Sequence, residues 1–258
     1  MSLVFQPNHR PSKSLYTHIL VVYVAVILGG WLVLPSIIPS PLKVYTALVD
    51  LVTHVGLLQE LWTSLSLNIH AIALSTVISL TIAYATAIPA FQPIGTIIAK
   101  GRFLSLIGLT FIFTVFIGGG YALKVALLTF GMTVFFVTSM VDVVAQVPDS
   151  DLDYARTLRY SEWRVLWEMR ILGTIGQAFD TLRQNAAMGW LMLTMVEGIV
   201  RSGGGIGRML LDEEKHFNLP AIFAVQLVFL LVGAGQDMFI RWIKSIVAPY
   251  ASLAYTKS

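Results

Sequence analysis

The sequence of 258 residues contains no cysteine and little charge. Without a thiol, the chain has no disulfide framework, no cysteine nucleophile, no iron–sulfur cluster and no cysteine-ligated zinc. Only 12% of the residues are charged, where an ordinary soluble domain has about 25%. The formal net charge of +3 is too small to indicate a surface for nucleic acid, so that partner class is excluded together with disordered and collagen-like chains.

Sequence motifs for nucleotide hydrolysis and metal catalysis are also absent. The chain has no G-x-x-x-x-G-K-[ST] loop for phosphate, no H-E-x-x-H and no G-x-S-x-G, and its five histidines show no metal-ligand spacing. The glycine-rich segment 203–207 is followed by Arg208 and does not match a dinucleotide-binding fingerprint, so we interpret it as a hinge. We therefore predict no catalytic residue, no metal site and no bound cofactor.

Apolar residues are abundant, because 56% of the chain is hydrophobic and the mean hydropathy is +0.77. A bilayer core is crossed by a helix of about 20 mostly apolar residues. Runs of this kind predict an all-α membrane protein in a single domain, 1–258, with six transmembrane helices. The predicted spans cover 15–34, 61–88, 103–117, 122–145, 178–200 and 220–243.

Basic residues divide unequally between the alternate loops of this six-span chain. Of the 17 lysines and arginines, five lie on one predicted side: Lys43, Lys124, Arg201, Arg208 and Lys215. The other twelve lie at the termini, in the loop near Lys100 and in the stretch from 146 to 183. Because cytoplasmic loops carry the excess of Lys and Arg, both termini are predicted to be cytoplasmic.

The stretch 146–176 is far too charged for a bilayer core, so it is predicted to be a cytoplasmic loop. Asp149 and Asp151 favour the start of one short helix, and Ser161 with Glu162 favours the start of a second. Apolar residues at helical spacing make both helices amphipathic. On periodicity alone, the pair is equally well interpreted as an interfacial hairpin that only supports the bundle.

Several short patterns in this loop and around it occur in an ordered series. They are Asp153, Tyr154, Ala155, Arg156, Thr157 and Leu158, then Trp163, Ile171 and Leu172, then Leu182, Arg183, Gly189 and Trp190. Before them stand Pro39, Ser40 and Pro41, and after them Glu197 with Gly205, Ile206 and Gly207. This series resembles the permeases of type I ABC importers, in particular the nitrate, sulfonate and taurine branch, whose EAA loop it contains.

The resemblance implies a transmembrane permease subunit of an ATP-driven importer in the bacterial inner membrane, which forms the substrate pathway. Its partners would be a second permease subunit in a homodimer, two cytoplasmic ATPase subunits that hold ATP and Mg²⁺, and an extracytoplasmic substrate-binding protein. Residues Asp153, Tyr154, Ala155, Arg156, Thr157, Leu158 and Arg159 would form the coupling helix that docks on the ATPase. The chain itself would not be an enzyme.

Three positions depart from the family pattern: Tyr154 replaces an alanine, Arg159 a glycine and Gly173 a proline. The glycine permits a left-handed turn that costs any other residue about 1–2 kcal/mol. Either the turn is built differently here, or the cost is accepted. An arginine at this point would suit pairing with an acidic residue of a dedicated ATPase.

Polar residues within the predicted spans are candidates for the pathway or a gate. We select Glu197, Asn185 and Asn68 for this role. Asp180 and Arg183 are three residues apart on one helical face, so we interpret them as a structural ion pair with each other.

Two other functions remain as alternatives. A secondary transporter would have inverted repeats and broken helices around a midplane ion site, and the two halves of this chain show no evident self-similarity. A membrane scaffold without transport activity would use the charged loop only as a docking platform.

Overall fold

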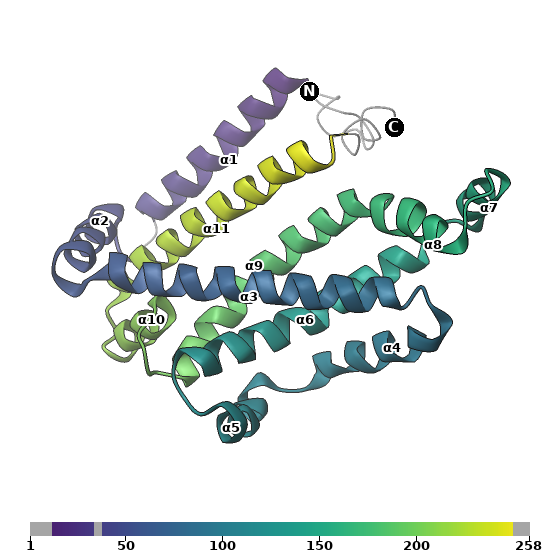
Figure 1. Ribbon diagram of the computed structural model, residues 1–258. Coiled ribbons are helices and arrows are strands. Elements are labelled where there is room, and N and C mark those ends of the chain that lie inside the picture. Colours follow the sequence, from purple (N-terminus) through teal and green to yellow (C-terminus); the bar gives the residue numbers. More distant parts are fainter. Residues whose placement is uncertain (1–11, 34–37, 250–258) are drawn as a thin grey trace.

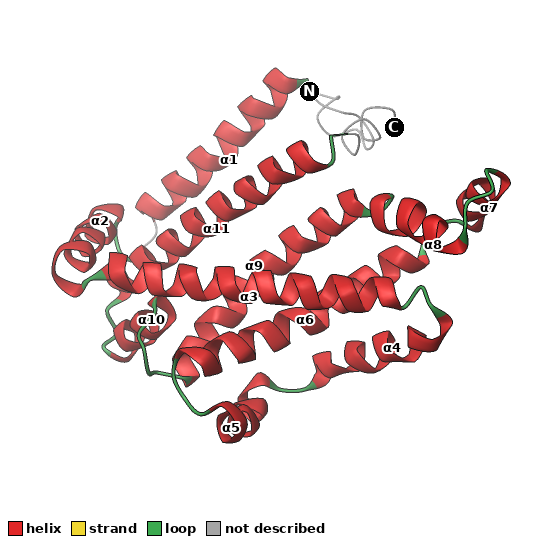
Figure 2. Ribbon diagram, viewed as in Figure 1, coloured by secondary structure: helices red, strands yellow, loops and turns green. Residues whose placement is uncertain are grey.

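The computed structural model describes residues 12–33 and 38–249, which fold into helices without a strand (Figures 1 and 2). Leu34, the last residue of the first predicted span, lies outside these residues, as do Arg10 and Lys257 of the charge count. The helices are α1 (Lys13–Val33), α2 (Pro41–Asp50), α3 (Leu57–Ala85), α4 (Gln92–Lys100), α5 (Leu106–Ile117), α6 (Tyr121–Ala145), α7 (Asp149–Thr157), α8 (Glu162–Val165), α9 (Ile175–Ile199), α10 (Ile206–Lys215) and α11 (Leu219–Val247). The all-α prediction is confirmed for this part of the chain.

Helices α3, α6 and α9 form the centre of the bundle. The buried face of α3 consists largely of small residues: Ser64, Ala71, Ser75, Ser79 and Ala83. Small side chains let helix backbones approach closely, and Ser79 Oγ donates to the Thr133 carbonyl of α6 at 3.3 Å. Met132 of α6 packs with Trp190 and Leu193 of α9 in the same core. The contacts between α3, α6 and α9 therefore set the framework to which the other helices are attached.

Helices α1, α2 and α11 form a second group beside this centre (Figure 1). The Trp31 ring of α1 stacks on Phe223 of α11 with 6.5 Å between centroids. Its Nε1 donates to the Pro39 carbonyl at 2.9 Å, which fixes the approach to α2. Trp190 of α9 meets Phe229 of α11 edge to face at 5.7 Å, so aromatic contacts join the two groups.

Among residues 12–33 and 38–249, four helices are long and apolar enough to cross a bilayer, at Ser14–Trp31, Leu57–Ala85, Tyr121–Ala145 and Leu219–Val247. The segments Pro89–Phe103 and Leu106–Ile117 meet at an angle of 110°, and counting this pair as one broken span raises the number to five. By length and composition, four or five helices qualify as spans, whereas the sequence predicted six.

The differences lie at the third and fifth predicted spans. In place of a straight third span, α5 has only 12 residues, about 18 Å of helix, and follows a sharp turn. Helix α9 is 25 residues long but carries Asp180, Arg183 and Glu197, which makes it more polar than the other long helices. A multi-pass membrane protein with four or five apolar helices is what the structure supports directly.

The connections gather at two opposite ends of the central helices (Figure 1). The α7–α8 segment lies at the end where α3 and α6 finish and α9 begins. Helices α2 and α10 lie at the other end, near the start of α3 and the end of α9. The two most unusual sites of the chain lie at these two ends, and α9 runs between them.

Candidate functional site

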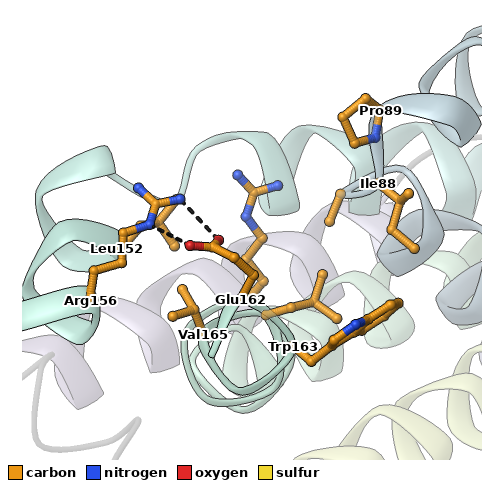
Figure 3. Close-up of a pocket in the computed structure, with 10 residues that line it drawn as sticks. Ile88, Pro89, Leu152, Arg156, Glu162, Trp163 and Val165 are labelled. Atoms are coloured by element: carbon orange, nitrogen blue, oxygen red, sulfur yellow. Dashed lines mark hydrogen bonds and ion pairs between the residues drawn. The ribbon is translucent and has the colours of Figure 1, made fainter. Parts of the chain in front are cut away.

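The first site is the hairpin formed by α7 and α8, which contains all of the predicted coupling residues. Arg156 joins its two helices: Nη1 donates to Asp153 Oδ1 at 2.8 Å, and Nε and Nη2 donate to the two carboxylate oxygens of Glu162 at 2.9 and 3.1 Å (Figure 3). These hydrogen bonds hold the pKa of the Arg156 guanidinium above the ordinary value of an arginine. They also hold the pKa of the Glu162 carboxyl below the ordinary value of a glutamate. The hairpin therefore holds itself together through its own charges.

Arg159 adopts the left-handed conformation, with φ of +59°. Of the two possibilities that the sequence allowed, the left-handed turn is therefore kept. The Arg159 N–H donates to the Arg156 carbonyl at 2.8 Å, and the Tyr160 N–H donates to the Ala155 carbonyl at 3.4 Å. This pair of bonds is the Schellman motif, in which glycine is the usual residue at the left-handed position. The turn is thus built as the family glycine would build it, and the chain accepts the conformational cost of an arginine.

The hairpin has an apolar inner side and an exposed outer side. Leu152, Ala155 and Val165 are buried together, with Tyr160 and Met169 packed against them. Six of the seven predicted coupling residues are exposed, and the exception is Ala155. On the exposed side lie four large apolar or aromatic residues: Tyr154, Leu158, Trp163 and Trp167. A small hairpin that exposes this much apolar surface is typical of a docking site.

A hollow of about 280 Å³ separates the hairpin from the turn that ends α3. Ile88 and Pro89 form one wall and Trp163 and Val165 the other, with Arg156 and Glu162 at its side (Figure 3). The hairpin is therefore not packed tightly against the neighbouring turn on this side, although its own core is closed.

Gly173, the third departure from the family pattern, lies where the hairpin joins α9. A π-helical segment, Leu166–Leu172, ends here, and the Gly173 N–H donates to the Glu168 carbonyl at 3.1 Å. A Cβ at Gly173 would collide with the Met169 carbonyl oxygen. Glycine is therefore required by this wider helical turn, which continues into α9 after two residues.

The second site is the junction of residues 203–208 with the side chains of Glu60, Ser64, Lys124 and Glu197, which we name the glycine junction. Glu197 is fully buried, and both of its oxygens accept hydrogen bonds: Oε1 from Ser64 Oγ at 2.6 Å and Oε2 from the Gly207 N–H at 2.7 Å. Ser64 Oγ accepts in turn from the Ile206 N–H at 2.8 Å. These groups satisfy N–H donors at the start of α10 that have no partner within the helix.

The remaining charges of the junction complete the same arrangement. Glu60 accepts from the Gly205 N–H and pairs with Arg208 Nη2 at 2.9 Å. Lys124, which is only 2% exposed, donates through Nζ to the Gly204 carbonyl at 2.6 Å. Sequence reasoning selected Glu197 but missed Glu60, Ser64 and Lys124, which come from two other helices. The available signal was the presence of ionisable residues at the ends of apolar runs, facing a loop of consecutive glycines.

Asn68 and Asn185 are placed in the interior, as buried residues of α3 and α9. Asn68 Nδ2 donates at 3.1 Å to Gln236 Oε1 of α11, and the same oxygen accepts from Trp190 Nε1 at 2.8 Å. Within the described part of the chain, Asn68 Oδ1 and both polar atoms of the Asn185 side chain have no hydrogen-bond partner. The structure thus places Asn68 and Glu197 in separate polar clusters along the central helices.

Asp180 and Arg183 do not pair with each other, contrary to the interpretation from their spacing. Lys244 Nζ of α11 donates to Asp180 at 2.7 Å, and Arg183 pairs with Asp237 of α11 at 3.2 Å. The cause is that α11 packs alongside α9, so that Lys244 lies beside Asp180 and Asp237 lies beside Arg183. These pairs join two helices instead of stabilising one.

No metal-binding cluster of three or more His, Asp or Glu side chains is found among residues 12–33 and 38–249.

No family model matches the chain. The chain is similar to the nitrate import permease protein NrtB of Synechococcus elongatus, with 26% identity over 135 residues that cover 47% of each protein. The chain thus spans about half the length of this curated relative.

Solved structures give a longer match. The fold is similar to that of a chain of the MetNI methionine ABC transporter in inward-facing conformations. In one crystal form the match covers 74% of this chain and 96% of the transporter chain, with a TM-score of 0.65 and 15% identity. A second crystal form gives a TM-score of 0.57 over the same shares. The fold is therefore that of a chain of an ABC transporter. With the permease relative, it confirms the resemblance to ABC importer permeases that the sequence predicts.

Proposed function

We propose that this chain is the transmembrane permease subunit of an ABC importer in the bacterial inner membrane. In this proposal it crosses the bilayer six times with both termini in the cytoplasm, and α4 with α5 and the polar helix α9 supply the third and fifth crossings. The observation that carries the proposal is the exposed α7–α8 hairpin on an ABC transporter fold. It presents Tyr154 and Leu158 outward, and it continues into α9.

The hairpin is suited to transmit force because it is stiff and anchored. Arg156 fixes α7 to α8, and the buried residues Leu152 and Val165 close the core between them. A push on the exposed face of α7 is therefore passed through the π-helical segment to α9 rather than absorbed locally. The residues from Asp153 to Arg159 act as the coupling helix in this account.

The partners follow from the same proposal. A second copy of the chain completes the pathway, two ATPase subunits bind ATP and Mg²⁺ and carry out hydrolysis, and an extracytoplasmic binding protein delivers the substrate. Asn68, Asn185 and Glu197 are our candidates for groups that line or gate the pathway. Because the similar protein NrtB is a nitrate import permease, nitrate is the first substrate to test.

Purification of the chain together with its cognate ATPase subunit tests the proposal. We expect the complex to hydrolyse ATP faster when the cognate binding protein and its ligand are added. The variants Asp153→Arg and Arg159→Glu should abolish this stimulation while the membrane domain stays folded, because they alter the exposed docking face. The matched control is Lys215→Glu, an exposed charge reversal at the opposite end of the bundle.

Three outcomes contradict the proposal. Normal stimulation in both hairpin variants would show that this hairpin does not couple the subunits. Uptake driven by an ion gradient through the chain alone would favour a secondary transporter, and a chain that binds the ATPase without affecting it would favour a scaffold.

A further inference from the structure

The glycine junction contains buried charges that the proposed coupling hairpin does not explain. Glu197 of α9 is 0% exposed and Lys124 of α6 is 2% exposed. Buried charges are costly unless each is paired or hydrogen-bonded. Their presence indicates that the chain maintains this arrangement in spite of its cost.

The loop of the junction has open space at one end and is tightly enclosed by side chains at the other. Gly203, Gly204 and Gly205 have φ of +81°, +75° and +121°, conformations that glycine adopts readily. Nothing lies within 4 Å of a Cβ built at Gly203, whereas a Cβ at Gly205 would overlap the Glu197 carboxylate. One part of the loop can therefore change conformation, and the next is held by side chains.

The four fixing side chains come from three different helices. Glu60 and Ser64 belong to α3, Lys124 to α6 and Glu197 to α9, and all of them hold the start of α10. Of these helices, α9 continues into the hairpin at its other end, after the π-helical segment and two further residues. A displacement of the hairpin along α9 therefore moves Glu197 relative to Ser64 and the Gly207 N–H.

We propose that Glu197 is a positioning residue that acts as a latch, which joins α9 to α3 and to the start of α10 in the present conformation and opens when α9 moves. The inference rests on the proposed function, because the hairpin must receive a push from an ATPase. Two hydrogen bonds of 2.6 and 2.7 Å to groups on α3 and α10 break together if α9 shifts by about one helical turn, a displacement known for packed helices. The freed N–H groups of α10 can then bind water, and the glycines supply the hinge.

Distance measurement between two spin labels tests the latch in the purified complex. Because the chain has no cysteine, Gln59→Cys on α3 and Ser202→Cys in the loop can be labelled without other changes, and both positions are exposed. We expect one short, narrow distance without nucleotide, and a longer distance after trapping with ATP and vanadate. The control pair Thr81→Cys and Ser139→Cys, on the closely packed helices α3 and α6, should keep its distance.

The variant Glu197→Gln separates a latch from a fixed cap. An amide has one oxygen in place of two, so glutamine cannot accept from Ser64 and from the Gly207 N–H at separate oxygens, and its NH₂ group comes to face one of these two partners. We expect the labelled pair to show the longer distance already without nucleotide. An unchanged distance in the trapped complex, or a variant that keeps the short distance and still lengthens it on trapping, would overturn the latch.

These failures are distinguishable from failure of the proposed function. If the complex forms and its hydrolysis rises with binding protein and ligand, the permease assignment stands, and an invariant distance refutes the latch alone. If no ATPase joins the chain, both proposals are refuted.

Discussion

The α7–α8 hairpin and the glycine junction both solve the problem of an unsatisfied helix end, but with different partners. The hairpin uses its own backbone and charges, since Arg156 reaches Glu162 only six residues along the chain. The junction uses side chains from distant segments, since Ser64 and Glu197 are 133 residues apart. The hairpin is therefore held by contacts within its own segment, whereas the junction exists only when the whole bundle is assembled.

The largest expected effect is at the buried carboxylate. Glu197→Ala leaves Ser64 and the Gly207 N–H without their acceptor and removes a carboxylate that interacts electrostatically with the buried Lys124. Breaking a buried charge arrangement typically costs about 3–5 kcal/mol. Denaturant unfolding of the purified protein in micelles should show this loss. Glu214→Ala, an exposed change on α10, should stay within about 0.5 kcal/mol, and an equal loss in both variants would contradict the account.

Two glycines of the same loop give the next test. At Gly205 an alanine would adopt a strained φ and also collide with Glu197, whereas at Gly203 it meets open space and has only the conformational cost. We expect Gly203→Ala to lose about 1 kcal/mol and Gly205→Ala about 3 kcal/mol or more. Thermal unfolding of the two variants measures the difference. Equal melting temperatures would show that the loop is not held by Glu197.

The hairpin offers an opposite expectation, because one change should stabilise it. Arg159→Gly removes the left-handed strain, and Arg159→Ala keeps it while removing the same long side chain. We expect the glycine variant to be more stable than the alanine variant by about 1 kcal/mol, confined to the hairpin. Hydrogen exchange of the amides of residues 156–165 measures this, and exchange in α9 should not change. A difference spread over the whole bundle would mean that the hairpin is not a local unit.

The smallest expected effect is the pH dependence of the hairpin. The pKa of Glu162 is lower in the folded protein than in the unfolded chain. Its pair with Arg156 therefore stabilises the hairpin at pH values above the pKa of Glu162 in the unfolded chain. That contribution is lost as the pH falls through the lowered pKa of Glu162 in the folded protein. Protection of hairpin amides should therefore decrease only below the ordinary glutamate pKa of about 4.3, relative to the same amides in Glu162→Gln at each pH. Parallel behaviour of both proteins would show that the ion pair does not contribute.

Sequence reasoning was most successful where the determinants are local. The two short helices of the hairpin begin near Asp149 and Glu162 as expected, and the cost of the turn at Arg159 was identified before the structure showed its φ. The resemblance also marked Glu197 and the glycines that follow it. Hydropathy alone explains why the long helices were found but the bend before α5 was not, because an apolar composition does not specify the angle between two short helices.

The remaining contacts depended on helix packing that no local pattern specifies. The spacing of Asp180 and Arg183 suggested a pair with each other, yet each pairs with α11, since Lys244 and Asp237 lie opposite them in the folded bundle. Lys124 was counted as a loop charge near a helix end, and its contact with Gly204 requires α6 and the loop before α10 to be neighbours. Such partners become predictable only when the arrangement of the helices is known.

The most direct test of the central claim is a cross-link between the hairpin and the ATPase. Leu158→Cys would be the only cysteine of the chain and lies on the exposed side of the hairpin. A short bifunctional reagent should join it to the ATPase subunit in the purified complex, whereas Leu230→Cys on the exposed face of α11 should give no such product. A complex that contains the ATPase but yields no cross-link from Leu158→Cys would contradict the assignment of this hairpin as the coupling element.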